Sequence, residues 1–133
     1  MKRFAAVFLI PAVFLCCGFR KKPVIILSSN LVTNDTAQVI ENTFNSQQKI
    51  YYALYSKKGF KKQGIRLQIS KQSDKTKKNW GFSIISAKDI YLDKNVNIYR
   101  DYIFIQTPGD YIIQFFYLDN KDYPFAHREF KVL

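Results

Sequence analysis

The sequence has few residues from which a catalytic or metal site could be built. Its 133 residues include two cysteines, Cys16 and Cys17, and one histidine, His127. A structural zinc site needs four nitrogen or sulfur ligands, and a hydrolytic triad needs an imidazole beside a nucleophile. Glu129 follows His127 by two residues, and no G-x-S-x-G motif accompanies the pair. We therefore expect no catalytic residue, no metal and no cofactor.

Glycine and cysteine are also scarce where a nucleotide site or a disulfide would need them. The five glycines form no G-x-x-x-x-G-K phosphate loop, and no cysteine follows Cys17. The chain beyond Cys17 must therefore be stabilised by apolar packing, and about 115 residues are enough to bury a core.

The N-terminus has the layout of a secretory signal. Lys2 and Arg3 precede an uncharged apolar run from Phe4 to Leu15, which ends at the two cysteines and Gly18. This run is shorter than the roughly 20 residues of a membrane-spanning helix. We assign 1–17 to a signal peptide, 18–36 to a tether with a first extended segment, and 37–133 to the folded domain.

The end of the apolar run resembles a bacterial lipoprotein signal, in which cleavage leaves an N-terminal cysteine that is acylated. The resemblance lies in Val13-Phe14-Leu15-Cys16-Cys17-Gly18. With Cys17 as acceptor, Phe14 stands where the usual pattern has leucine, and Cys16 supplies the small residue before cleavage. The alternative acceptor, Cys16, would put bulky Leu15 at the cleavage point. The resemblance implies export, a lipid anchor and a location in the bacterial cell envelope.

Positive charge is concentrated in one segment. The formal net charge is +11, and residues 57–78 hold nine basic residues against one acid, Asp74. The nine are Lys57, Lys58, Lys61, Lys62, Arg66, Lys71, Lys75, Lys77 and Lys78. Such a segment could bind a polyanion, such as nucleic acid, an anionic lipid or an acidic glycan. The simpler interpretation, which we favour, is a pair of solvated loops in a lysine-rich chain.

Alternating apolar residues predict strands from Ala37 to the C-terminus. The clearest half-buried strand has Ile65, Leu67 and Ile69 on its inner face. Further runs are 49–55, 80–85, 97–106, 110–118 and 125–133, with Phe130 and Val132 as the inward pair of the last. In 97–106 we expect Tyr102 to face inward and Tyr99 to face outward. Turns at intervals of 8 to 14 residues favour a β-sandwich or small barrel.

The segment Gly109-Asp110-Tyr111-Ile112-Ile113 resembles the tyrosine corner of immunoglobulin-like domains. The resemblance implies that the Tyr111 hydroxyl bonds back to the preceding backbone and that Trp80 is a core residue. Together with the signal, it makes the chain similar to small bacterial surface lipoproteins. We therefore expect an all-β, immunoglobulin-like antiparallel sandwich of about seven strands.

The lysine clusters are not expected to form one compact patch. If the runs 49–55, 65–70 and 80–85 form a meander, the loops 56–64 and 71–79 lie at opposite ends of the middle strand, about 20 Å apart. This separation, with export from the cytoplasm, argues against a nucleic-acid partner.

Aromatic residues suggest a contact surface. The chain has 12 Phe and nine Tyr, and alternation predicts that Tyr51, Tyr55 and Tyr99 face outward, where tyrosine favours recognition of proteins or glycans. The sequence thus predicts a non-catalytic, lipid-anchored binding domain with a protein or glycan partner. One alternative is a polyanion- or envelope-surface-binding module that uses the lysine-rich loops. Another is a small secreted enzyme or enzyme inhibitor.

Overall fold

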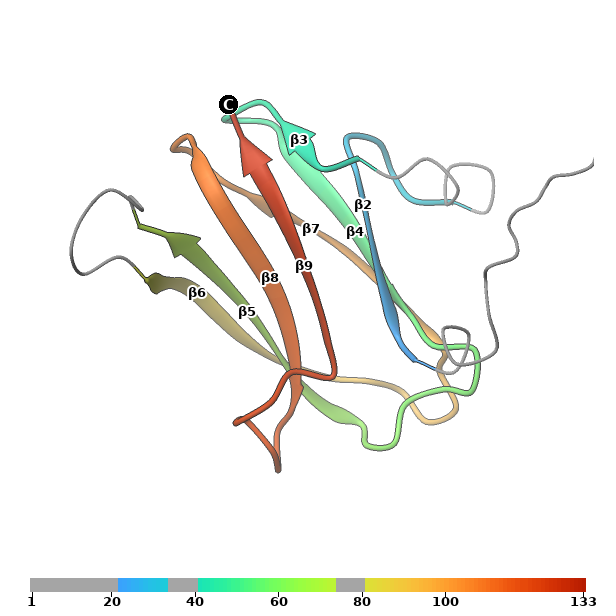
Figure 1. Cartoon of the computed structure of the whole chain (residues 1–133). Coiled ribbons are helices and arrows are strands. Elements are labelled where there is room, and N and C mark those ends of the chain that lie inside the picture. The colour runs from blue at the N-terminus through green and yellow to red at the C-terminus, as the bar shows by residue number, and fades with distance from the viewer. Residues whose placement is uncertain (1–21, 34–40, 74–80) are drawn as a thin grey trace, which may run out of the picture.

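The computed structural model describes residues 22–33, 41–73 and 81–133. Within these ranges the chain forms eight strands and no helix, which confirms the all-β prediction (Figure 1). A three-stranded sheet contains β2 (Val24–Ser28), β4 (Lys49–Tyr55) and β7 (Ile98–Phe104), in that order. A five-stranded sheet has the order β3 (Thr43–Phe44), β9 (Ala126–Val132), β8 (Gly109–Tyr117), β5 (Gly64–Gln72) and β6 (Phe82–Tyr91). The described residues contain no helix long and apolar enough to cross a membrane.

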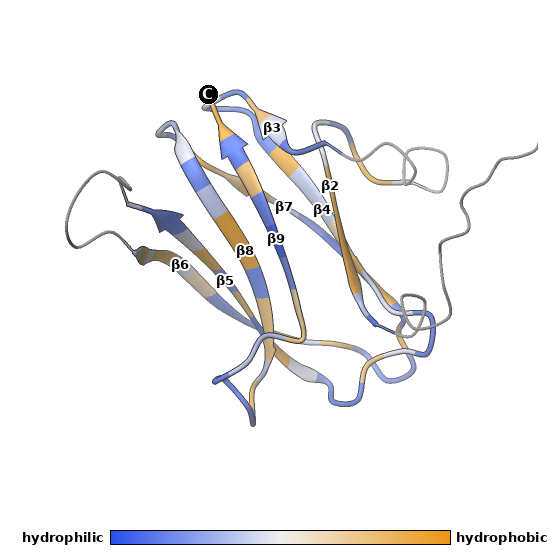
Figure 2. Ribbon diagram, in the orientation of Figure 1, coloured by the Kyte–Doolittle hydropathy of each residue, from blue (hydrophilic) through white to orange (hydrophobic). Residues whose placement is uncertain are grey.

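The two sheets share one apolar core, which makes the fold a β-sandwich. The core residues alternate along each strand with residues of the opposite face, as the two-residue period of a strand requires. In the five-stranded sheet Ile65, Leu67 and Ile69 of β5 are buried, as are Phe130 and Val132 of β9. The inward faces predicted for these two strands are therefore confirmed. Figure 2 shows the alternation as orange and blue bands along β8 and β9.

The first extended segment is part of the sandwich. Strand β2 pairs antiparallel with β4 along its whole length, from Val24 opposite Tyr55 to Ser28 opposite Tyr51. Its inward residues, Ile25 and Leu27, are buried in the common core. The segment is apolar because one face of this edge strand packs against the core beside β4, so residues 24–28 fold with the domain that we expected to begin at 37.

Strands β4 and β5 follow one another in the sequence but lie in different sheets. β4 pairs with β2 and β7, whereas β5 pairs with β6 and β8. The meander considered for 49–55, 65–70 and 80–85 is therefore wrong, because only the last two of these strands are neighbours. Sequence patterns find strands but not their partners, and a connection of eight residues is long enough to cross from one sheet to the other.

Strand β6 is a free edge of the five-stranded sheet. Its pairing with β5 shifts register once, so that Ile69 lies opposite Ser86 and Ser70 lies opposite Ile84. Ile85 is the extra residue of this β-bulge, which bends the strand locally. Nine of the ten β6 residues are exposed, and Ile90 is the buried one.

Tyr111 fixes the connection between β7 and β8. Its hydroxyl donates to the Thr107 carbonyl at 2.7 Å and lies 2.9 Å from the Thr107 Oγ1. The ring is 1% exposed and stacks on Phe130 with centroids 5.6 Å apart. This is the backward hydrogen bond that the resemblance implied. Gly109 begins β8 at φ +152°, where a Cβ would meet the Lys71 side chain at 2.7 Å. Trp80 lies outside the described residues.

Replacement of Tyr111 tests the contribution of this corner. We expect Tyr111→Phe to lower the free energy of unfolding by about 1 kcal/mol, because the ring is kept but the Thr107 carbonyl loses its donor. Urea unfolding of the two proteins gives the difference. Tyr123→Phe is the matched control, since Tyr123 is 76% exposed, and an equal loss in both variants would contradict the role of the corner.

Candidate functional site

An exposed aromatic surface covers the outer side of the three-stranded sheet. On β4, Tyr51 and Tyr55 point away from the core, opposite to the fully buried Ile50 and Leu54. The register places Tyr102 beside Tyr51, and their ring centroids are 6.1 Å apart. We give the name aromatic face to six outward side chains of β4 and β7: Lys49, Tyr51, Tyr55, Arg100, Tyr102 and Phe104. Tyr102 and Phe104 are each about half exposed, at 48% and 50%.

The charges on the aromatic face are positive. Arg100 is exposed opposite Ala53, and Lys49 is exposed opposite Phe104. The Lys49 ammonium lies 4.6 Å from the centre of the Tyr102 ring, which is within the range of a cation–π interaction. No acidic residue lies on the outward side of β2, β4 or β7 within their described bounds. The face therefore combines large aromatic contact area with positive charge.

Tyr99 is not part of the aromatic face, so that prediction is wrong. It pairs with the fully buried Leu54, and its ring packs against Tyr52 with centroids 6.2 Å apart. The orientation predicted for residues 97–106 is inverted, with Ile103 buried and Tyr102 exposed. Both alternate sets on this strand are apolar, so the period alone cannot choose between them. The structure buries Ile103 and Ile105, packs Tyr99 against the core, and leaves Tyr102 and Phe104 outside.

A second surface, strongly basic, lies at the end of the sandwich where β2 begins. The connection between β4 and β5 lies beside the connection between β6 and β7, and two backbone hydrogen bonds join them. The Leu92 N–H donates to the Gln63 carbonyl at 2.8 Å, and the Ser56 N–H donates to the Asn97 carbonyl at 2.9 Å. A hollow of about 470 Å³ lies between them. We call its lysines the basic end: Lys57, Lys58, Lys61, Lys62 and Lys94. Sequence analysis did not identify Lys94, because only the arrangement of the strands in two sheets brings these two connections together.

The other basic residues of the predicted polyanion set lie elsewhere. Arg66 is on β5, where its Nε contacts the Asp89 carboxylate at 2.8 Å and lowers the pKa of that carboxyl. Lys71 lies near the far end of β5, with its ammonium 5.7 Å from the Tyr111 ring centre. Lys75, Lys77 and Lys78 lie outside the described residues. The nine residues therefore do not form one surface, and the basic end combines four of them with Lys94.

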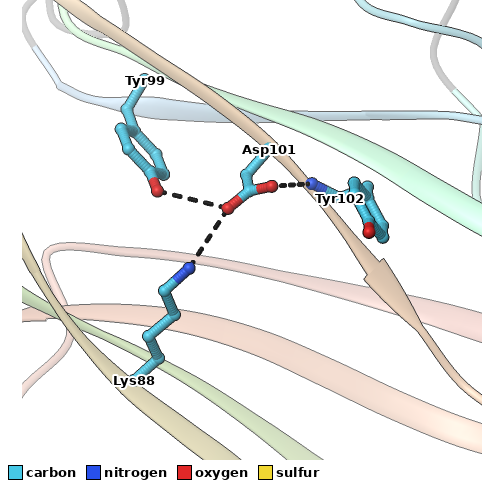
Figure 3. Close-up of polar contacts among 4 residues, drawn as sticks. All are labelled: Lys88, Tyr99, Asp101 and Tyr102. Carbon is cyan, nitrogen blue, oxygen red and sulfur yellow. Dashed lines mark hydrogen bonds and ion pairs between the residues drawn. The ribbon is translucent and has the colours of Figure 1, made fainter.

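A polar cluster closes the gap between the sheets where β6 and β7 are both edges (Figure 3). The Asp101 carboxylate accepts hydrogen bonds from the Tyr102 N–H at 2.8 Å, the Lys88 ammonium at 3.3 Å and the Tyr99 hydroxyl at 3.3 Å. Burial raises the pKa of Asp101, but these donors outweigh it, and the net pKa lies below the usual value. Burial, with Asp101 nearby, raises the pKa of Tyr99. The cluster thus links the two sheets through the ion pair between Lys88 on β6 and Asp101 on β7.

The two residues considered for catalysis, His127 and Glu129, are both exposed on β9. His127 is exposed on the outer side of the five-stranded sheet, opposite Gln114, and Glu129 is exposed opposite Ile112. In the parts of the chain that the structure describes, no three His, Cys, Asp or Glu residues are grouped so as to hold a metal ion. Cys16 and Cys17 lie outside those parts.

Comparison with protein-family models and with curated protein sequences gives no relative on which a function could rest. No protein-family model matches the chain, and no curated protein is similar to it in sequence.

The Asp101 cluster predicts a defined pH dependence of stability. Because the folded pKa is depressed, Asp101 stabilises the protein above its unfolded pKa of about 3.9, and this contribution is lost as the pH falls through the folded value. We expect Asp101→Asn to be less stable than the parent at pH 7 by up to about 1 kcal/mol, as for other partly exposed ion pairs.

Urea unfolding at pH 7 and near pH 2 would measure this effect. The difference between Asp101→Asn and the parent should nearly vanish at the lower pH. Asp122→Asn, at an exposed position, serves as control and should differ little from the parent at either pH. A gap for Asp101→Asn that is the same at both pH values would contradict the assignment.

Proposed function

We propose that the protein is an exported, lipid-anchored, non-catalytic binding domain of the bacterial cell envelope whose aromatic face receives a protein partner. The observation that carries the proposal is the exposure of Tyr55, Tyr102 and Phe104 together with Arg100 on one sheet face. Exposed apolar patches mark interaction sites, and Tyr, Phe and Arg are the residues enriched in protein interfaces.

The chemistry of this face indicates what the partner presents. Arg100 and Lys49 lie among the aromatic rings without an acidic residue on the same described face. A complementary surface is apolar with carboxylates placed over these two cations, because opposite charges across an interface guide docking and fix its register. An exposed sheet face suits a folded protein surface better than a small ligand, which binds in a concave pocket.

We infer further that the sandwich is immunoglobulin-like. Three features support this inference: the division into sheets of order β2-β4-β7 and β3-β9-β8-β5-β6, the passage of the chain from one sheet to the other between β7 and β8, and the Tyr111 hydroxyl bond to Thr107 at that passage. Such sandwiches occur in many cell-surface proteins and serve mostly as scaffolds for contact surfaces.

The lipid anchor can be tested by intact mass. We expect the mature chain to begin at Cys17 and to carry added acyl mass when the full chain is expressed in a bacterial host. Each acyl methylene buried in the bilayer contributes about 0.8 kcal/mol, so the chain should fractionate with membranes. Cys17→Ala should lose both properties, and Cys16→Ala should keep both. The reverse pattern would assign the anchor to Cys16, and an unmodified soluble parent chain would remove the anchor from the proposal.

The protein partner can be tested by photo-crosslinking in cells. A benzophenone amino acid placed at Tyr102 or Tyr55 should give a discrete adduct with another protein, whereas the same probe at exposed His127 on the other sheet should not. Charge reversal by Arg100→Glu should reduce the Tyr102 adduct at least tenfold, because it puts like charges together across the interface. Lys131→Glu is the matched control. Equal adducts from both sheets, or an adduct unaffected by Arg100→Glu, would refute the proposed face.

A further inference from the structure

The basic end lies at the end of the sandwich from which the N-terminal segment leaves. Val24, the first residue of β2, pairs with Tyr55, the last residue of β4, and the lysine-rich connection begins directly after Tyr55. Strand β7 begins beside the same residue, with Ile98 opposite Tyr55. Figure 1 shows the start of β2 together with the connections β4–β5, β6–β7 and β8–β9 at the lower end of the molecule. The basic end and the exit of the tether are therefore on the same side of the fold.

The tether is short enough to hold the basic end close to a membrane in which Cys17 is anchored. Seven peptide units join Cys17 to Val24, and a fully extended chain of that length spans at most about 25 Å. A lipid on Cys17 would thus keep Val24, at this end of the sandwich, within about 25 Å of the membrane, whatever path the tether takes. A short tether also gives a high effective concentration, so that individually weak contacts with the surface become significant.

We propose that the basic end rests on an anionic phospholipid surface, with its lysines against the headgroups. The proposal rests on the lipid anchor of the proposed function and names the surface that the anchored domain meets. Lys62 is paired with Asp119 at 2.9 Å, but Lys57, Lys58, Lys61 and Lys94 make no ion pair with any described acid. All four are exposed. Each is free to contribute an attraction of the size known for lysines close to an anionic membrane.

Exposed tyrosines at the same end support a membrane rather than a soluble polyanion. Tyr123 and Tyr91 have the highest exposed fractions of any large apolar residue in the described ranges, 76% and 74%. Tyr123 lies in the β8–β9 connection, and Tyr91 ends β6 opposite Gly64, where the basic connection returns to the sheet. Tyrosine is enriched at membrane interfaces, where its ring sits at headgroup level with its hydroxyl in water. Lysine with tyrosine around a tether is the combination expected for a membrane-facing end.

Lysine acetylation provides a direct test with the full chain. The protein is expressed with its own N-terminal segment, purified in detergent and reconstituted into vesicles of phosphatidylcholine alone or with 30% phosphatidylglycerol. Acetylation rates are then read by mass spectrometry. We expect Lys57, Lys58, Lys61 and Lys94 to react about fivefold more slowly on the anionic vesicles, the effect of one lysine–headgroup contact. Lys49, Lys71 and Lys131, on other parts of the fold, should react within twofold of their rate on neutral vesicles.

A charge-matched pair of variants controls for nonspecific attraction. Lys57→Gln/Lys58→Gln/Lys61→Gln should raise Lys94 acetylation on anionic vesicles to the rate on neutral ones. Lys49→Gln/Lys71→Gln/Lys131→Gln removes the same charge elsewhere and should leave Lys94 protected. Protection at 100 mM NaCl that disappears at 500 mM is expected, because salt screens exposed charges.

Three outcomes would overturn the inference. These are equal acetylation of both lysine groups, equal effects of the two triple variants on Lys94, or protection of Lys94 by heparin but not by phosphatidylglycerol, which would identify a glycan instead. The anchor is read separately by intact mass on the same sample. An acylated, vesicle-bound chain with unprotected lysines refutes only the lysine contact. An unacylated chain that still floats on anionic vesicles with protected lysines refutes only the anchor.

Discussion

The packing of two sheets against one apolar core is the constraint on which the rest of this structure depends. The described chain contains no cysteine, so side chains alone must hold the sheets at a fixed distance. Tyr52 from one sheet meets Phe115 from the other with ring centroids 5.8 Å apart, and both are buried. At the two sides where the layers would open, polar side chains bridge them. Lys88 and Asp101 join β6 to β7, and Arg128 donates to the Ile25 carbonyl from β9.

Because the core takes one set of alternate residues, the other set faces the solvent. In β4 the inward residues are needed for packing, and Tyr51 and Tyr55 are displayed without any special local conformation. The same rule applies in β7, where burial of Ile103 presents Tyr102 to solvent. Residues in the connections between strands are not subject to this alternation. The connections between strands lie at the surface, so their lysine side chains remain hydrated and no charge has to be buried.

The sequence predicts where strands occur but not which strands pair or how each is oriented. Period-two patterns locate β5 and β9 and their inward residues, because apolar and polar residues alternate there cleanly. The pattern fails for β7, in which Tyr99, Tyr102 and Ile103 are all apolar enough to be buried, so the orientation is decided by the partner strand. Lys94 and Lys57 are 37 positions apart and come together only because β4, β5, β6 and β7 are arranged in two sheets. Tyr111 was identified because its corner is local, with donor and acceptor only four positions apart in the sequence.

The exposed edge of β6 bears on how such domains can be crowded together. A ten-residue edge strand with Phe82, Ile84 and Ile85 exposed would ordinarily invite pairing with the same strand of a neighbouring molecule. Two features oppose this pairing. The bulge at Ile85 interrupts the straight row of backbone donors and acceptors. Lys88 points inward to Asp101, so a neighbouring strand would have to break this ion pair or bury its charges. Many copies could therefore lie side by side at high concentration without polymerising into fibrils.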